Sequence, residues 1–339
     1  AGSSYVAVEN GKIRACVGAF DHDISVCGER IATRGIGNVA VHPYERSRGF
    51  MRKLMNMAVE DMKKDGIALS VLGGRRQRYM YFGYDRGGTV YSMSFNSDNI
   101  RHTFGKGYDP FFAFRRVSSP DDSALADIRL LSESYPLFAI RPEGRRYFET
   151  LVSWGDKVCV FTHDGEFAGY CLYNDTTVSE VLLTEKYRSD FALFVRDFFG
   201  FIGKGGLKVK LPLYLSDYFN RIKTVGESYS LEICKSFCVL NFKKVAGAFM
   251  KLASTVCRLP DGELAVSIDG IGGRENLLFA VHDGVPSVTE AVGPCDMNLT
   301  HFEAMNLFFA STDPSRLELP GFARAWLPLP LAIYHADTV

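Results

Sequence analysis

The clearest hydrophobic pattern in the chain predicts a short buried strand followed by a one-sided helix. Residues 38–42 contain Val39-Ala40-Val41, an apolar run typical of a buried strand, and Pro43 opens a turn after it. Between residues 50 and 62 the apolar side chains recur at helical spacing. They are Phe50, Met51, Leu54, Met55, Ala58, Val59 and Met62. Gly66 marks the expected end of this helix, and residues 67–72 predict a second buried strand.

The segment between that strand and that helix is polar and basic. It reads Arg46-Ser47-Arg48-Gly49, which brings two guanidinium groups and a glycine to a helix N-terminus. Free N–H groups and the positive dipole end make a helix N-terminus favourable for anions, and arginine strengthens such a site. We therefore expect an anionic ligand at residues 46–52. Taken alone, the loop could also be a chance basic turn.

Alternating patterns predict a strand meander before this loop. Strands are expected at 5–8, 13–20, 24–27 and 36–41, with a hairpin at Asn10-Gly11 and a turn at 28–30. After the strand at 67–72 the chain reads Tyr79-Met80-Tyr81-Phe82-Gly83-Tyr84, and a further strand is expected at 89–95. This order indicates a mixed α/β domain over residues 1–108.

A second segment, residues 109–231, repeats the order of strands, helix and strand. Its expected helices are 121–135, 142–152 (with Pro142 in the first turn) and 187–202, and its expected strands are 158–162, 167–173, 177–183 and 207–213. The repeated order indicates an internal duplication. The loop at 184–190 contains no glycine, so the second copy is expected to have lost its ligand site.

A third α/β segment is expected from residue 232 to residue 339. Its expected strands are 237–242, 264–268, 277–281 and 288–291, and its expected helices are 245–256 and 301–310. The sequence ends on an apolar run at 327–334, although chain ends are usually polar. A buried C-terminal segment would need a functional reason.

Length, charge and cysteine usage narrow the class of protein. A chain of 339 residues is too long for one core, so two or three domains are expected. A net charge of zero gives no support to nucleic acid or an anionic membrane as a partner, and no apolar run is long enough to span a membrane. The eight cysteines form no Cys-x-x-Cys pair, which favours reduced thiols in a cytoplasmic protein without a metal site.

Taken together, the motifs resemble one family. Val39-x-Val41-x-Pro43, then Arg46-x-x-Gly49 before a helix, and then Tyr79-x-x-Phe82-Gly83-Tyr84 resemble the GCN5-related N-acetyltransferases, in particular the enhanced-intracellular-survival (Eis) acetyltransferases. The resemblance implies an α/β (α+β) fold with tandem acetyltransferase domains, 1–108 and a degenerate 109–231, followed by a sterol-carrier-like domain, 232–339. The first domain is expected to be N-terminally incomplete, because the family's first strand and two helices have no counterpart here.

The same resemblance implies the site residues. Backbone groups of Val39–Val41 would bind the pantetheine arm of acetyl-CoA, and the amides of residues 47–52 would bind its pyrophosphate. Tyr79 would be the general acid, and the carboxylate of Val339 would be the base. The implied cofactor-binding residues are Val39, Ala40, Val41, Arg46, Ser47, Arg48, Gly49, Phe50, Met51, Arg52 and Gly74. At Gly74 the family often has a hydroxyl residue, and this chain departs from that pattern.

Acetyl transfer to an amine suits these residue types. An alkylammonium with a pKa of about 10.4 must lose a proton before it attacks, and a carboxylate can accept that proton. A phenol with a pKa of about 10 can protonate the departing thiolate. No covalent enzyme intermediate is needed, so the lack of a Ser-His or Cys-His signature is no objection. Tyr79 could instead be a core aromatic residue, and residues 75–78 could be either a solvated basic face or a site for the 3′-phosphate of CoA.

The sequence therefore predicts an acetyl-CoA-dependent N-acetyltransferase. The acceptor would be a primary amine of a small molecule, such as an aminoglycoside or polyamine, or a peptide lysine. Acetyl-CoA would be the co-substrate without a metal, and the protein would be a cytoplasmic homo-oligomer. Two rivals remain: another acyl-CoA transferase, such as an N-myristoyl or peptidyl transferase, and a non-catalytic acyl-CoA or lipid-binding protein.

Overall fold

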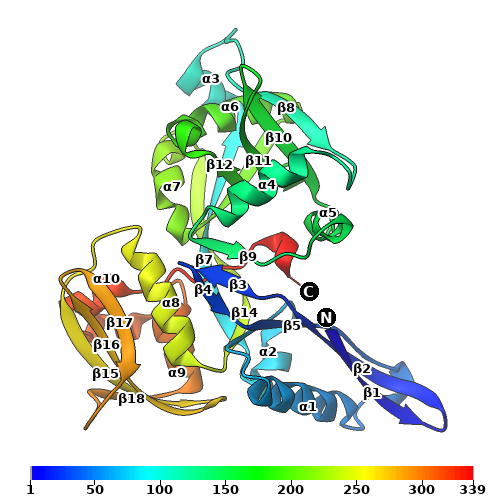
Figure 1. The fold of residues 1–339 in the computed structure, drawn as a ribbon, viewed down its shortest axis with the longest axis vertical. Helices are drawn as coiled ribbons and strands as arrows, with labels where there is room; N and C mark the ends of the chain where they lie inside the picture. Colours follow the sequence, from blue (N-terminus) through cyan, green and yellow to red (C-terminus); the bar gives the residue numbers. More distant parts are fainter. Residues whose placement is uncertain (1, 339) are drawn as a thin grey trace. The chain divides into compact units, whose positions relative to one another are not determined.

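The computed structural model describes residues 2–338, which form two compact units (Figure 1). Of these residues, the first unit contains 2–88, 233–331 and 338, and the second contains 89–232 and 332–337. Strands β7 (Asp85–Asn96) and β14 (Ser228–Val239) each begin in one unit and end in the other. The division into three domains at residues 108 and 231 stays a prediction.

The first unit begins with the antiparallel meander that the alternating pattern predicted. The hairpin turn at Asn10-Gly11 joins β1 and β2, and both turn residues have a positive φ. The turn expected at 28–30 is replaced in part by a short strand, β4, which pairs with β3. The strands are β1 (Gly2–Glu9), β2 (Lys12–Asp21), β3 (Ile24–Val26), β4 (Glu29–Ile31) and β5 (Thr33–Val41).

Helix α1 (Phe50–Lys64) packs against strands β1, β2 and β5. The predicted apolar stripe is on its buried side: Leu54, Met55, Ala58, Val59 and Met62 are buried. After the helix, β6 (Leu69–Leu72) runs parallel to β5, and β14 pairs antiparallel with β6. The strand order in this unit is therefore β1-β2-β5-β6-β14. A short helix, α2 (Arg76–Tyr79), and a 3-10 turn at Met80–Phe82 follow β6.

The rest of the first unit combines a four-stranded sheet, in the order β17-β16-β15-β18, with three helices. The strands are β15 (Gly262–Gly270), β16 (Gly273–His282), β17 (Val285–Glu290) and β18 (Met297–Thr300). The helices are α8 (Phe242–Ser254), α9 (His301–Phe309) and α10 (Gly321–Trp326). The strand expected at 237–242 was wrong at its end: β14 stops at Val239 because Asn241 caps α8, its side chain accepting the N–H of Lys244 at 2.8 Å. Neither β18 nor α10 was predicted.

In the second unit, six strands follow one another in the sheet in the order β7-β13-β12-β11-β10-β8. Besides β7, its strands are β8 (Ala113–Val117), β10 (Lys157–His163), β11 (Glu166–Asn174), β12 (Thr177–Leu183) and β13 (Gly206–Pro212). The other elements of the unit are α3 (Ser97–Phe104), α4 (Ala124–Glu133), β9 (Leu137–Ala139), α5 (Arg145–Leu151), α6 (Phe191–Ile202) and α7 (Ser216–Ile222). All four strands predicted for residues 109–231 are present, whereas β8, β9, α3 and α7 were not predicted.

All three helices expected in the second unit begin later than predicted. Helix α4 begins at Ala124 and not at residue 121. Helix α5 begins at Arg145, so Pro142 lies outside it; Gly144, at φ 61°, precedes the first turn. Helix α6 begins at Phe191, because residues 185–190 form a 3-10 turn. Its Phe191, Phe194 and Phe198 are fully buried at helical spacing and form the centre of the unit's core.

The eight cysteines carry no disulfide. Between residues 2 and 338 no group of three or more histidine, cysteine and acidic side chains is placed to hold a metal ion. Within the same residues, none of the helices has the length and apolar character needed to cross a membrane.

Candidate active site

Strands β5 and β6 diverge in the first unit, and within residues 2–338 no strand pairs with that edge of β5 beyond Ile36. Their parallel pairing runs from Thr33 opposite Leu69 to Ile36 opposite Leu72, where β6 ends. Strand β5 continues for five more residues, to Val41. Along these five residues β5 is paired on one edge, the edge that faces β2. A strand edge of this kind presents free N–H and C=O groups to an extended ligand.

The backbone groups of Val39 and Val41 are the ones that face this open edge. The N–H of His42 donates to the carbonyl of Arg14 in β2 at 2.8 Å, so residue 42 points toward β2. Because hydrogen-bonding direction alternates along a strand, Ala40 also points toward β2, and Val39 and Val41 point away. The ladder with β2 is irregular next to this stretch, where Asn38 and Val39 stand opposite Val17 alone. The expected contact of Val39 and Val41 with an extended ligand is thus geometrically available, whereas the Ala40 backbone pairs with Cys16.

The N-terminus of α1 follows directly, and its first turn lacks an internal cap. Gly49 is the N-cap at φ 79°, no side chain caps the helix, and no acidic residue lies in the first turn. The N–H groups of residues 50–52 therefore have no partner within the helix. Ser47, at φ 66°, and Gly49 are both exposed. These features are those of an anion-binding helix N-terminus.

The arginines of this loop differ in their partners. Arg48 forms two hydrogen bonds with Glu9, Nη2 to Oε1 at 2.7 Å and Nη1 to Oε2 at 2.9 Å, and a further ion pair with Glu45. These contacts lower the pKa of Glu9 and raise that of Arg48. Arg46 and Arg52 are exposed and, among residues 2–338, form no ion pair. Of the three guanidinium groups, those of Arg46 and Arg52 are thus free to meet an anion directly.

Tyr79 lies beside the end of β6. It is the last residue of α2 and 7% exposed, and its ring packs over the α-carbon of Gly74, two residues after β6. A Cβ at Gly74 would lie 2.5 Å from Tyr79 Cε2. Among residues 2–338 no group hydrogen-bonds to the Tyr79 hydroxyl, which leaves it available to a ligand.

Two contacts fix the turn that carries Tyr79. At its start, Arg76 forms a bidentate ion pair with the buried carboxylate of Asp85, with Nη2 2.9 Å from Oδ2. At its end, His301 Nε2 donates to the carbonyl of Gly83 at 2.8 Å, while His301 Nδ1 accepts the N–H of Ile271 at 3.3 Å. Desolvation lowers the pKa of His301, which favours this neutral form. Sequence patterns gave no signal for His301, 218 residues from its partner.

One core cluster of the first unit brings most of the expected residues together. It contains buried Tyr79, Leu54 and Leu72, and its partly buried members include Val39, Val41, Phe50 and Met51. Gly74 joins it through the ring of Tyr79, and the loop 46–49 and Arg52 adjoin it along the chain. Val339, expected to supply a base, lies outside the described residues.

The corresponding strands of the second unit also diverge, but side chains occupy the gap. Strands β12 and β13 pair only at residues 177–178 and 208–209. Farther along β12, the carbonyl of Leu183 accepts the Tyr135 hydroxyl at 2.7 Å, and its N–H donates to the Tyr218 hydroxyl at 3.0 Å. The two hydroxyls also bond to each other at 2.6 Å. The backbone groups at this position are therefore already satisfied by the protein.

A family model matches the first part of the chain. Residues 1–87 match the model described as an acetyltransferase (GNAT) domain. No curated protein sequence matches the chain.

Solved structures resemble the fold over nearly the whole chain. A GCN5-related N-acetyltransferase from Kribbella flavida has a TM-score of 0.65 at 18% identity, covering 99% of this chain and 87% of that one. A probable N-acyltransferase from Enterococcus faecalis V583 has a TM-score of 0.65 at 17% identity, covering 100% and 87%. Eis1 from Mycobacterium abscessus has a TM-score of 0.60 at 14% identity, covering 97% and 90%. At these identities the likeness shows the fold.

Proposed function

We propose, because residues 1–87 match the model of an acetyltransferase (GNAT) domain, that this chain transfers the acetyl group of acetyl-CoA directly to a primary amine. The observation that carries the proposal is the open edge of β5 at Val39 and Val41, which is followed by the uncapped N-terminus of α1. The backbone of Val39 and Val41 would bind the pantetheine amides as a neighbouring strand would. The amides of residues 47–52, with Arg46 and Arg52, would bind the pyrophosphate.

The chemical step needs one proton acceptor and one proton donor. The amine nitrogen attacks the thioester carbonyl, the new C–N bond forms, and the C–S bond breaks. The amine loses its proton to a base, and the thiolate gains one from an acid. Tyr79 is the proposed acid, because its hydroxyl is unengaged beside the end of β6. The carboxylate of Val339 stays the expected base; it lies outside the described residues.

The acceptor is proposed as a primary amine of an aminoglycoside-like or polyamine-like small molecule, or a peptide lysine. Three negatively charged side chains on hairpins and loops of the first unit, Asp21, Asp23 and Glu29, would attract such a cation, although each also has an arginine or lysine partner. Residues 232–339 are proposed as a sterol-carrier-like domain. Supporting this, α8 packs against β16 and β17 of a separate four-stranded sheet within them.

The test is the release of free CoA thiol from acetyl-CoA in the presence of a panel of amines. Tyr79→Phe keeps the ring that packs on Gly74 and removes only the hydroxyl. It should lower kcat by about 10²- to 10⁴-fold, the usual contribution of a general acid, and leave the Kd for acetyl-CoA unchanged. Tyr81→Phe is the matched control, because Tyr81 is two residues away and 76% exposed.

Three outcomes separate the alternatives. Full turnover in Tyr79→Phe would remove the acid role and keep the enzyme. Turnover only with longer acyl-CoA thioesters would favour another acyl transferase. Tight acetyl-CoA binding without thiol release for any amine would favour a non-catalytic acyl-CoA-binding protein.

A further inference from the structure

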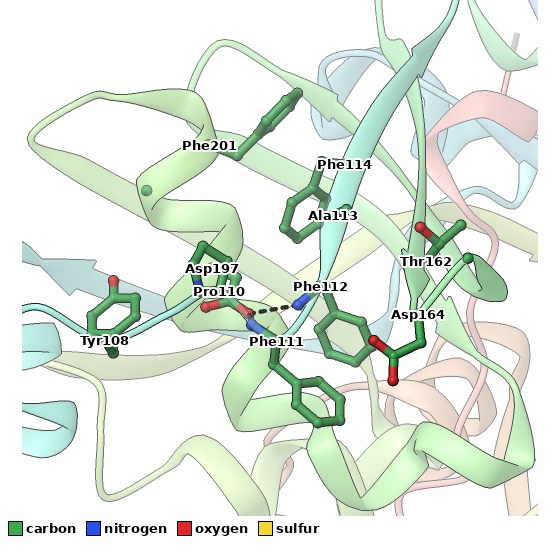
Figure 2. Close-up of a pocket in the computed structure, with 12 residues that line it drawn as sticks. Tyr108, Pro110, Phe111, Phe112, Ala113, Phe114, Thr162, Asp164, Asp197 and Phe201 are labelled. Carbon is green, nitrogen blue, oxygen red and sulfur yellow. Dashed lines mark hydrogen bonds between the residues drawn. The ribbon is translucent and has the colours of Figure 1, made fainter.

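The second unit contains a cavity of about 710 Å³ between strand β8 and the C-terminal part of α6 (Figure 2). Its volume falls within the range of about 300–1,000 Å³ that is usual for small-molecule sites. The aromatic side chains that line it are Tyr108, Phe111, Phe112, Phe114 and Phe201. All but Phe112 are only half-buried, so apolar ring surface is left uncovered in the cavity.

A buried ion pair fixes one wall of this cavity. The carboxylate of Asp197, whose side chain is 1% exposed, accepts the N–H groups of Phe111 and Phe112 at 2.8 and 3.0 Å. Its other oxygen accepts Arg196 Nε at 2.6 Å, and the Arg196 guanidinium lies 4.3 Å from the centre of the Tyr108 ring. A buried ion pair is costly to desolvate, and here it holds the segment 108–112 in place. The aromatic wall is thus formed before any ligand arrives.

The polar edge of the cavity carries negative charge. Figure 2 shows Thr162 and Asp164 on the side away from Tyr108. The Asp164 side chain is 90% exposed and has His163 Nε2 as a neighbour at 3.4 Å. Asp197 is already satisfied by three donors, so Asp164 is the carboxylate that remains available to a ligand. The lining residues, all of them within the described chain, include no lysine or arginine.

We propose that this cavity is a binding site for an amphiphilic primary amine. The apolar body of the ligand packs among the aromatic rings, and its ammonium group lies at Asp164 and Thr162. The site goes beyond the proposed transfer reaction, and its occupancy is measured with no acetyl-CoA present.

The probe is 2-phenylethylamine, titrated calorimetrically into the full chain. Saturable binding is expected, and 2-phenylethanol, which lacks the charge, should bind more weakly. Asp164→Asn should weaken the amine by about two- to fivefold, as expected for an exposed ion pair. Asn tolerates the positive φ of 50° at this hairpin. Asp283→Asn is the matched control, since Asp283-Gly284 is another hairpin with φ 51° at the aspartate.

A second variant fills the cavity without disturbing its walls. Gly200 lines the cavity from α6, and within residues 2–338 no atom outside its chain neighbours and its own helix backbone lies within 4 Å of the position a Cβ would take. Gly200→Leu should therefore abolish binding of 2-phenylethylamine and leave the thermal stability undiminished. Unchanged binding in Gly200→Leu would overturn the proposal, because the amine would then bind elsewhere. Equal affinity for 2-phenylethanol, or no saturable binding of the amine, would overturn it as well. None of these results bears on thiol release, which tests the proposed function separately.

Discussion

The ring of Tyr79 occupies the space that a side chain at Gly74 would need. A Cβ at Gly74 would come within 2.5 Å of Tyr79 Cε2 and 3.1 Å of Cδ2. The glycine at this position therefore has a steric explanation in this chain. It lets the tyrosine ring pack closely against the backbone beside the end of β6.

Gly74→Ala should consequently reduce turnover by displacing Tyr79. A displacement of about 1 Å at a catalytic group can cost about 10²-fold in rate, and we expect a fall of that order in kcat. Gly73→Ala is the matched control, because apart from its two chain neighbours no atom of the described residues lies within 4 Å of a Cβ placed there. Thiol release from acetyl-CoA measures both variants. Equal turnover in the two variants would contradict the steric role of Gly74.

The ion pairs of Arg48 with Glu9 and Glu45 compete with any phosphate for its guanidinium group. Glu9→Gln should release Arg48 in part and tighten acetyl-CoA binding by about two- to fivefold, the range of exposed ion pairs.

Arg46→Ala should weaken acetyl-CoA binding at low salt and have less effect at high salt, because exposed charges are screened. Calorimetric Kd values at two salt concentrations test both.

The control for Glu9→Gln is Glu149→Gln, which removes an exposed ion pair with Arg145 in the second unit. It should leave the Kd for acetyl-CoA unchanged. Weaker acetyl-CoA binding in Glu9→Gln would contradict the competition. It would show that Glu9, through Arg48, holds the loop in the conformation that binds acetyl-CoA.

The local pattern of the sequence predicted the scaffold of the site better than its side-chain contacts. Helix α1 and its buried stripe follow from spacing alone, because periodicity reports which side of a helix is buried. The pairing of Arg48 with Glu9 joins residues 39 positions apart, and no periodicity encodes it. No periodicity encodes the contacts of Asp197 either. It accepts the N–H groups of residues 111 and 112, and the sequence did not predict that this segment lines a cavity.

The predicted internal duplication illustrates the same limit. The absence of glycine from residues 184–190 predicted a lost site in the second copy. It did not indicate that Tyr135 and Tyr218 would supply hydroxyls to Leu183. Those contacts depend on three elements meeting in space, whereas the glycine signal is local to one loop.

His301 should make the stability of the protein depend on pH. Burial lowers its pKa from the ordinary value of 6.5, so the unfolded chain takes up a proton at a higher pH than the folded chain does. The contribution of neutral His301 to the stability of the folded state is complete above pH 6.5. It is lost as the pH falls from 6.5 through the lower pKa that His301 has in the folded state. The free energy of unfolding should fall by at most about 1.4 kcal/mol per pH unit from this one group. Denaturant unfolding between pH 7.5 and pH 5 measures it.

The control uses a second histidine. His301→Asn should flatten the pH dependence below 6.5, while His102→Asn, at an exposed position in α3, should not. The same slope in His301→Asn as in the unchanged protein would mean that other groups dominate the acid loss of stability.

Each chain should bind one molecule of acetyl-CoA. The open edge of β5 in the first unit offers the groups of Val39 and Val41, whereas those of Leu183 are bonded to Tyr135 and Tyr218. Calorimetry should give one site per chain.

Tyr218→Phe leaves the Leu183 N–H with only the longer contact to the Tyr135 hydroxyl, at 3.3 Å. This variant should lower the free energy of unfolding by about 1–3 kcal/mol and should not create a second acetyl-CoA site. Tyr229→Phe, which alters an exposed tyrosine, should change neither quantity. Two sites per chain would show that acetyl-CoA displaces these hydroxyls, and the second copy would then count as a functional acetyltransferase domain.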